Sequence, residues 1–137
     1  MSYVTPTDIG SKYRFLAHAG SEYVKEVLEG RKPEIPQRFP EAVTTFFEKV
    51  VHGSQDGSSL EDMVHYRLGI DALDGPKEQA PARLKVLAEV SASFVAGKGT
   101  VSELTVLQSF FEKLFRLSDR NATESYVTGK ASYYTIS

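Results

Sequence analysis

Apolar side chains recur every three or four residues along most of this chain, and this spacing limits the possible fold more than any other feature. In the segment 43–51 they follow the i, i+3, i+4, i+7, i+8 pattern in full, which places them on one side of a helix. Four further segments share this period, whereas no stretch of useful length alternates apolar and polar residues. The sequence therefore predicts an all-α protein, a compact bundle of about five amphipathic helices.

The first two predicted helices are bounded by capping and stop signals. Thr5 with Asp8 has the spacing of a capping box, so we expect the first helix to start there and to end at Gly30. The second helix is expected to start near Pro40 and to end at Gly53, where the loop sequence GSQDGSS begins. Both helices are long enough to contribute a full apolar stripe to a core.

Capping and stop signals also bound the third and fourth predicted helices, of which the third is the shorter. Ser58 or Ser59 offers an N-cap for the third helix, whose apolar positions are Leu60, Met63, Val64 and Leu68, with Arg67 on the same stripe. It should stop at the sequence DGP, residues 74–76. The fourth helix is expected to start near Pro81 and to end at the sequence GKG, residues 97–99.

The fifth predicted helix opens with Thr100 and Glu103 at capping-box spacing. Ala122, Tyr126, Gly129 and Tyr133 roughly extend its apolar face, so this helix is expected to run on toward the C-terminus. The tail SYYTIS, residues 132–137, is typical of irregular or β-prone chain. Phenylalanines on the helical stripes are predicted to form the core, namely Phe46, Phe47, Phe94, Phe110 and Phe111.

Length and composition predict one domain, residues 1–137, built as a single helical bundle. Apolar residues make up 41% and charged residues 25% of the chain, which is ordinary for a globular protein. No secretory signal or membrane span is visible, and the chain has no cysteine, which excludes disulfides and thiolate metal sites. These features favour a cytoplasmic location and no membrane partner.

Histidines and carboxylates offer one incomplete metal motif. Asp62 and His65 stand three residues apart, as in half of a di-metal site inside a helical bundle. The second half would need another carboxylate-x-x-His pair, and Glu48 with His52 has a spacing of four instead. We therefore expect His65 to be a surface histidine near a helix start, and we predict no metal.

No catalytic signature is present either. The sequence AGKGT, residues 96–100, differs from a phosphate-binding loop because Ala92 replaces the first glycine and Gly99 follows the lysine. It is expected to end one helix and start the next. No serine lies in a nucleophile elbow, and the adjacent carboxylates Glu61 and Asp62 diverge on a helix. The sequence predicts a protein that is not an enzyme and that binds no cofactor.

Basic residues form rows opposite the apolar stripes of the first and last helices. The net charge of −2 argues against nucleic-acid binding over the whole surface but leaves room for a local basic face. If the two terminal helices pack side by side, their rows would merge, with steps of about 5–10 Å along a helix that suit a phosphate backbone. The rows and the basic cluster that follows the first helix contain Arg14, His18, Lys25, Arg31, Lys32, Arg38, Lys113, Arg116 and Arg120.

The helix pattern, the basic face and the late segment FFEKLF…SYVTGKASYY resemble the helical small subunit of CRISPR (Cascade-type) effector complexes. They are also similar to the equivalent C-terminal helical domain of the large subunit. The resemblance implies copies that stack along a guide-RNA assembly and contact DNA through backbone phosphates, without catalysis. The residues that it implies for this contact are Lys12, Arg14, Lys25, Arg31, Lys32, Arg38, Lys113, Arg116 and Arg120.

Three readings of the function follow from the sequence. The first is a non-enzymatic subunit that binds the backbone of single-stranded or duplex DNA, or of guide RNA, inside a multisubunit complex that can include further copies of itself. The second is a protein-binding adaptor or structural subunit whose basic faces meet acidic protein surfaces, without nucleic-acid contact. A third, an enzyme with a site that no motif reveals, would require a deep pocket lined by His65 and several carboxylates.

Overall fold

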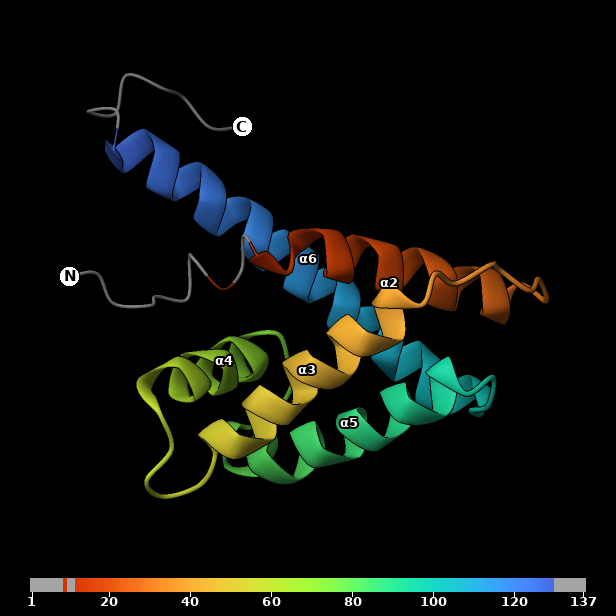
Figure 1. The fold of residues 1–137 in the computed structure, drawn as a ribbon, viewed down its shortest axis with the longest axis horizontal. Coiled ribbons are helices and arrows are strands. Elements are labelled where there is room, and N and C mark those ends of the chain that lie inside the picture. The colour runs from red at the N-terminus through yellow and green to blue at the C-terminus, as the bar shows by residue number, and fades with distance from the viewer. Residues whose placement is uncertain (1–8, 10–11, 130–137) are drawn as a thin grey trace.

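The computed structural model describes residue 9 and residues 12–129, with side chains as far as residue 117, and it is helical with no strand over this range (Figure 1). The prediction of a compact all-α bundle of about five amphipathic helices is confirmed. In chain order, the elements are α2 (Arg14–Leu28), α3 (Arg38–Gly53), α4 (Leu60–Asp71), the 3₁₀ turn η1 (Lys77–Gln79), α5 (Ala80–Val95) and α6 (Val101–Gly129).

The two terminal helices of this set, α2 and α6, pack lengthwise against each other, and α3 lies between α4 and α5 in the rest of the bundle (Figure 1). The apolar stripes of these helices meet in one core. The phenylalanines predicted for the core are all at most 4% exposed, which confirms their assignment: Phe46, Phe47, Phe94, Phe110 and Phe111. The C-terminal turns of α6 extend past the N-terminal end of α2 (Figure 1).

Two predicted caps are present as hydrogen-bonded groups. Thr100 and Glu103 form a reciprocal capping box, in which the Glu103 amide donates to Thr100 Oγ1 at 3.2 Å and the Thr100 amide donates to Glu103 Oε1 at 3.0 Å. Of the two candidate caps of α4, the structure uses Ser59, whose Oγ accepts from the Asp62 amide at 3.1 Å. These caps set the starts of α6 and α4.

The structure describes the start of α3 but not the predicted start of the first helix. The regular run of α2 begins at Arg14, after its N-cap Tyr13 with φ −100° and ψ 9°, and the predicted start at Thr5 and Asp8 lies outside the described residues. The second predicted helix, α3, begins at Arg38, close to the predicted start near Pro40. Pro40 sits in its first turn, where a missing N–H costs nothing.

The buried face of α4 is rotated from the predicted stripe. Leu60 and Met63 are 56% and 51% exposed, whereas Val64, His65, Leu68 and Gly69 are buried. A Cβ on Gly69 would lie 3.2 Å from side-chain carbons of Leu84 and Val50, so a glycine allows this face of α4 to approach α3 and α5. His65 is thus fully buried, and the prediction of a surface histidine was wrong.

Candidate nucleic-acid interface

The side-by-side packing of α2 and α6 meets the condition under which the two basic rows would merge. Two members of the α2 row, Arg14 and His18, lie beside the ring of Phe115 on α6. The Arg14 guanidinium lies 5.6 Å from the centre of that ring, and the His18 ring lies 5.2 Å from it. Carboxylates interrupt the surface, since Glu22 lies between His18 and Lys25 on α2 and is exposed. The outer side of the α2–α6 pair is therefore of mixed charge.

Two of the nine predicted contact residues form ion pairs with carboxylates of the same chain. Arg31 pairs with Glu29 and lies 3.8 Å from Glu26, and its side chain remains 58% exposed. Lys113 Nζ donates to Asp74 Oδ1 at 3.0 Å. This hydrogen bond, together with the charge of Lys113, lowers the pKa of Asp74. Arg31 and Lys113 are therefore less available to an external anion than their exposure suggests.

Most of the other predicted residues lie at the surface. No carboxylate within the described side chains forms an ion pair with Lys12, Lys25, Lys32, Arg38 or Arg116, and each of these five is exposed. Arg14 is exposed as well. The side chain of Arg120 lies outside the described side chains. The fold thus leaves several cations directed to solvent, on more than one side of the α2–α6 pair.

Lys12 and Arg38, which are distant in sequence, are brought together at a groove between the start of α2 and the start of α3. The groove has a volume of about 600 Å³ and is mainly apolar. Phe15 lines it and is 66% exposed, and the Arg38 guanidinium lies 5.3 Å from the centre of the Phe15 ring. We call this feature the Phe15 groove; it is lined by Lys12, Tyr13, Phe15, Leu16, Ala19, Tyr23, Pro36, Arg38, Phe39 and Ala42.

A second basic concavity lies where the loop after α2 meets the turn between α5 and α6. Its volume is about 510 Å³, and Arg31, Lys32 and Lys98 line it above apolar residues such as Ile35 and Phe94. Around Lys98 the backbone ends α5 and starts α6, because the Lys98 amide donates back to the Ser93 carbonyl at 2.8 Å. The interpretation of AGKGT as a helix stop and start is confirmed.

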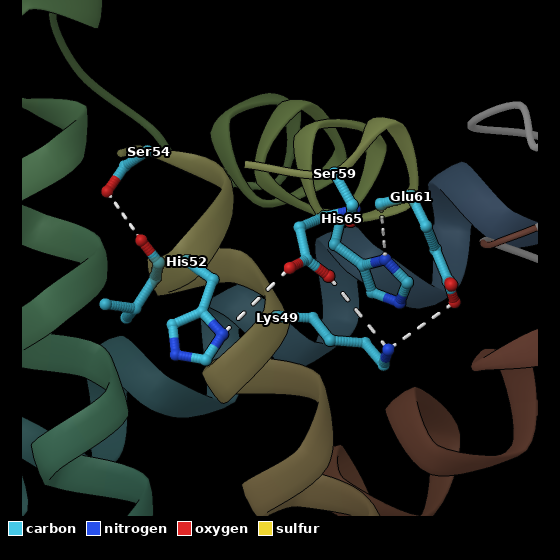
Figure 2. Close-up of polar contacts among 8 residues, drawn as sticks. Lys49, His52, Ser54, Ser59, Glu61 and His65 are labelled. Atoms are coloured by element: carbon cyan, nitrogen blue, oxygen red, sulfur yellow. Dashed lines mark hydrogen bonds and ion pairs between the residues drawn. The ribbon is translucent and has the colours of Figure 1, made fainter. Parts of the chain in front are cut away.

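A polar cluster joins α3 to α4 (Figure 2). Lys49 Nζ lies 3.6 Å from a Glu61 carboxylate oxygen and 4.0 Å from Asp62, and the His52 ring also approaches Asp62 at 4.0 Å. These contacts hold the second and third described helices together and leave Asp62 engaged with Lys49 and with the His52 ring. Among the described residues, no group of three histidines and carboxylates lies close enough to hold a metal ion.

His65 points from α4 into the core beside Tyr13. Its Nδ1–H donates to the Glu61 carbonyl at 2.8 Å (Figure 2). Within the described structure, His65 Nε2 and the Tyr13 hydroxyl are buried without a hydrogen-bond partner. Burial lowers the pKa of His65, and the nearby positive charges of Lys49 and Lys12 act in the same direction. Burial also raises the pKa of Tyr13, with a further contribution from the Glu61 carboxylate.

Two residues of these concavities escaped the sequence analysis. Phe15 lies off the apolar stripe of the first helix, and a phenylalanine on the polar side of an amphipathic helix is a readable signal of a contact surface. Lys98 was treated only as part of a helix stop. Its proximity to Lys32 depends on how two chain turns meet in space, which no local pattern encodes.

No protein-family model, curated protein or solved structure matches this chain. None of the helices in the described part of the chain is both long enough and apolar enough to cross a membrane.

Proposed function

We propose that this chain is a non-enzymatic helical subunit of a larger nucleoprotein complex, of the CRISPR interference type, that binds nucleic-acid backbone through basic surface residues. The observation that carries the proposal is the Phe15 groove, where Lys12 and Arg38 lie at one aromatic-lined concavity. Cations beside exposed aromatic surface are the arrangement that binds nucleic acids without reading sequence. The resemblance to CRISPR small subunits points to the same function.

Backbone binding fits the spread of the exposed cations. Lys32 and Lys98 supply a second anion-accepting concavity, and Lys25 and Arg116 add single charges elsewhere. Each contact with a phosphate contributes affinity but no sequence information. With few contacts per molecule, binding is weak for one copy and becomes useful when several copies, or other subunits, engage the same strand in the cytoplasm.

The test is fluorescence anisotropy with labelled single-stranded DNA, duplex DNA and RNA at two salt concentrations. For three or four phosphate contacts on a single strand, affinity should fall about 20- to 50-fold between 50 and 200 mM salt. Arg38→Glu and Arg116→Glu should each weaken binding, whereas Lys85→Glu, an exposed charge reversal on α5, is the matched control. Binding that ignores salt, or no binding at high protein concentration, would contradict the proposal.

One observation favours the second reading, a protein-binding adaptor without nucleic-acid contact. An apolar groove of about 340 Å³ runs between α5 and α6, and two of the valines that line it are exposed, Val86 by 56% and Val106 by 49%. Exposed apolar surface of this kind commonly marks a protein contact. Association with a partner subunit that persists at high salt and is lost in Val86→Glu and Val106→Glu, without any nucleic-acid binding, would support this reading.

A further inference from the structure

The Phe15 groove combines three features that backbone binding alone does not require. Phe15 presents a large ring surface to solvent, although Arg38 lies against it at 5.3 Å from the ring centre. Behind the ring, the groove is lined by apolar and aromatic side chains and is about 600 Å³ in volume, within the range of small-molecule sites. A phosphate needs only the cations, so the apolar part of the groove suits a different chemical group.

Resting on the proposed function, we propose that the Phe15 groove is a base-stacking site for single-stranded nucleic acid, with one nucleobase against the Phe15 ring and the adjoining phosphates at Arg38 and Lys12. Every base offers a flat π-face, so stacking on an aromatic side chain tolerates any sequence. In a duplex the faces of the bases are already stacked on each other. The site therefore selects single strands over duplexes.

The walls of the groove are held in place by the core. The Tyr23 ring meets Phe39 edge to face at 5.0 Å, which ties α2 to α3. The Tyr13 ring also meets the Phe46 ring edge to face, with 4.8 Å between the ring centres. Lys12 Nζ lies over the Tyr13 ring, 5.5 Å from its centre. Because these contacts fix both helices, the site needs little rearrangement to accept a base, and this raises affinity.

The second basic concavity lacks an exposed ring. Phe94, the phenylalanine that lines it beside Lys32 and Lys98, is 4% exposed and belongs to the core. That concavity suits phosphate contact alone. Within the described side chains, the two concavities therefore bind different parts of the strand. The Phe15 groove binds one base with its adjoining phosphates, and Lys32 and Lys98 bind phosphates farther along the backbone.

The experiment compares a short labelled oligothymidylate with an abasic deoxyribose-phosphate strand of the same length. Phe15→Ala should weaken binding of the base-bearing strand by roughly 5- to 150-fold and leave binding of the abasic strand unchanged. Phe15→Tyr, which retains a ring, should restore most of the affinity. Val101→Ala, an exposed apolar truncation at the start of α6, is the matched control. Circular dichroism of each variant checks that the bundle remains folded, which the exposure of Phe15 favours.

The outcomes separate this inference from the proposed function. Equal, salt-sensitive binding of the two strands, unaffected by Phe15→Ala, would overturn base stacking and leave backbone binding in place. Loss of affinity for both strands in Phe15→Ala would also overturn it, since the ring would then support the cations rather than a base. If neither strand binds, both the inference and the proposed function fail.

Discussion

The ring of Phe111 occupies the space that a side chain at Gly20 would need: a Cβ on Gly20 would lie 2.8 Å from two carbons of the ring. Phe111 is completely buried, so its ring has no room to move aside. The absence of a side chain at residue 20 therefore allows α2 and α6 to pack as closely as they do. These are the two helices on which the sequence places the basic rows.

Gly20→Ala is expected to destabilise the protein by about 1–3 kcal/mol, the usual cost of overpacking a tight core contact. The direction of this change in the free energy of unfolding is informative, because at an exposed helix position alanine stabilises the helix relative to glycine by about 1 kcal/mol. Urea unfolding followed by circular dichroism measures the change. Thr45→Ala, at an exposed position of α3, should shift stability by less than about 0.5 kcal/mol. Equal stability of Gly20→Ala and the unaltered protein would show that α2 and α6 can separate at little cost.

Thr100→Ala should cost about 1 kcal/mol, because it removes the hydroxyl that accepts from the Glu103 amide at 3.2 Å. Thr105→Ala is a suitable comparison: its hydroxyl donates to the Val101 carbonyl within the helix and caps nothing. The midpoints of urea unfolding for the two variants should therefore differ, with Thr100→Ala the less stable. A larger loss in Thr105→Ala would contradict a capping role for Thr100.

Most of the fold could be predicted because the apolar period and the caps are local. The capping box of Thr100 was readable as such, and so was the helical stripe that buries Phe46 and Phe47. The buried face of α4 could not be predicted, because neighbouring helices that approach closely bury His65 and Gly69, not the hydrophobicity of these two residues. Burial of a polar side chain depends on its neighbours, which a single-helix pattern omits.

The interface was predictable only as a set of charges. That Lys12 and Arg38 meet at one groove depends on the angle between α2 and α3, and that Lys113 is neutralised depends on Asp74, which lies 39 residues away in sequence. Sequence position shows which residues are cationic. Which of them face a common anion, and which are already paired, is decided by tertiary packing.

His65 should make the stability of the protein depend on pH. Its pKa is lowered in the folded state, so the unfolded chain binds the proton more readily. The stability due to neutral His65 is complete above the unfolded pKa of about 6.5 and is lost as the pH falls below it, by at most about 1.4 kcal/mol per pH unit. Urea midpoints at a series of pH values between about 7.5 and 5.5 measure this loss.

His65→Gln keeps an N–H donor for the Glu61 carbonyl but cannot titrate, so its stability should change less over that pH range. His52→Gln is the matched control, because it makes the same exchange at a histidine that is 63% exposed. Parallel pH profiles for His65→Gln and the unaltered protein would mean that carboxylates, rather than His65, are responsible.

Asp74→Asn should strengthen nucleic-acid binding. The Asp74 carboxylate accepts a hydrogen bond from Lys113 at 3.0 Å, and its negative charge offsets the charge of Lys113. Lys113 in turn lowers the pKa of Asp74. The amide carries no charge, so Lys113 becomes available to a phosphate, and the nearby Arg116 loses a competing anion. One added phosphate contact should steepen the dependence of log affinity on log salt by about 0.7 on a single strand.

The slope is measured by anisotropy titrations over a series of salt concentrations, with Asp56→Asn as the matched control. Asp56 is an exposed carboxylate in the loop between α3 and α4, and its neutralisation changes the net charge by the same amount without releasing Lys113. If both variants bind more tightly to the same extent, net charge alone explains the gain. A steeper slope in Asp74→Asn alone places Lys113 on the nucleic-acid path, whereas an unchanged slope removes it from the interface.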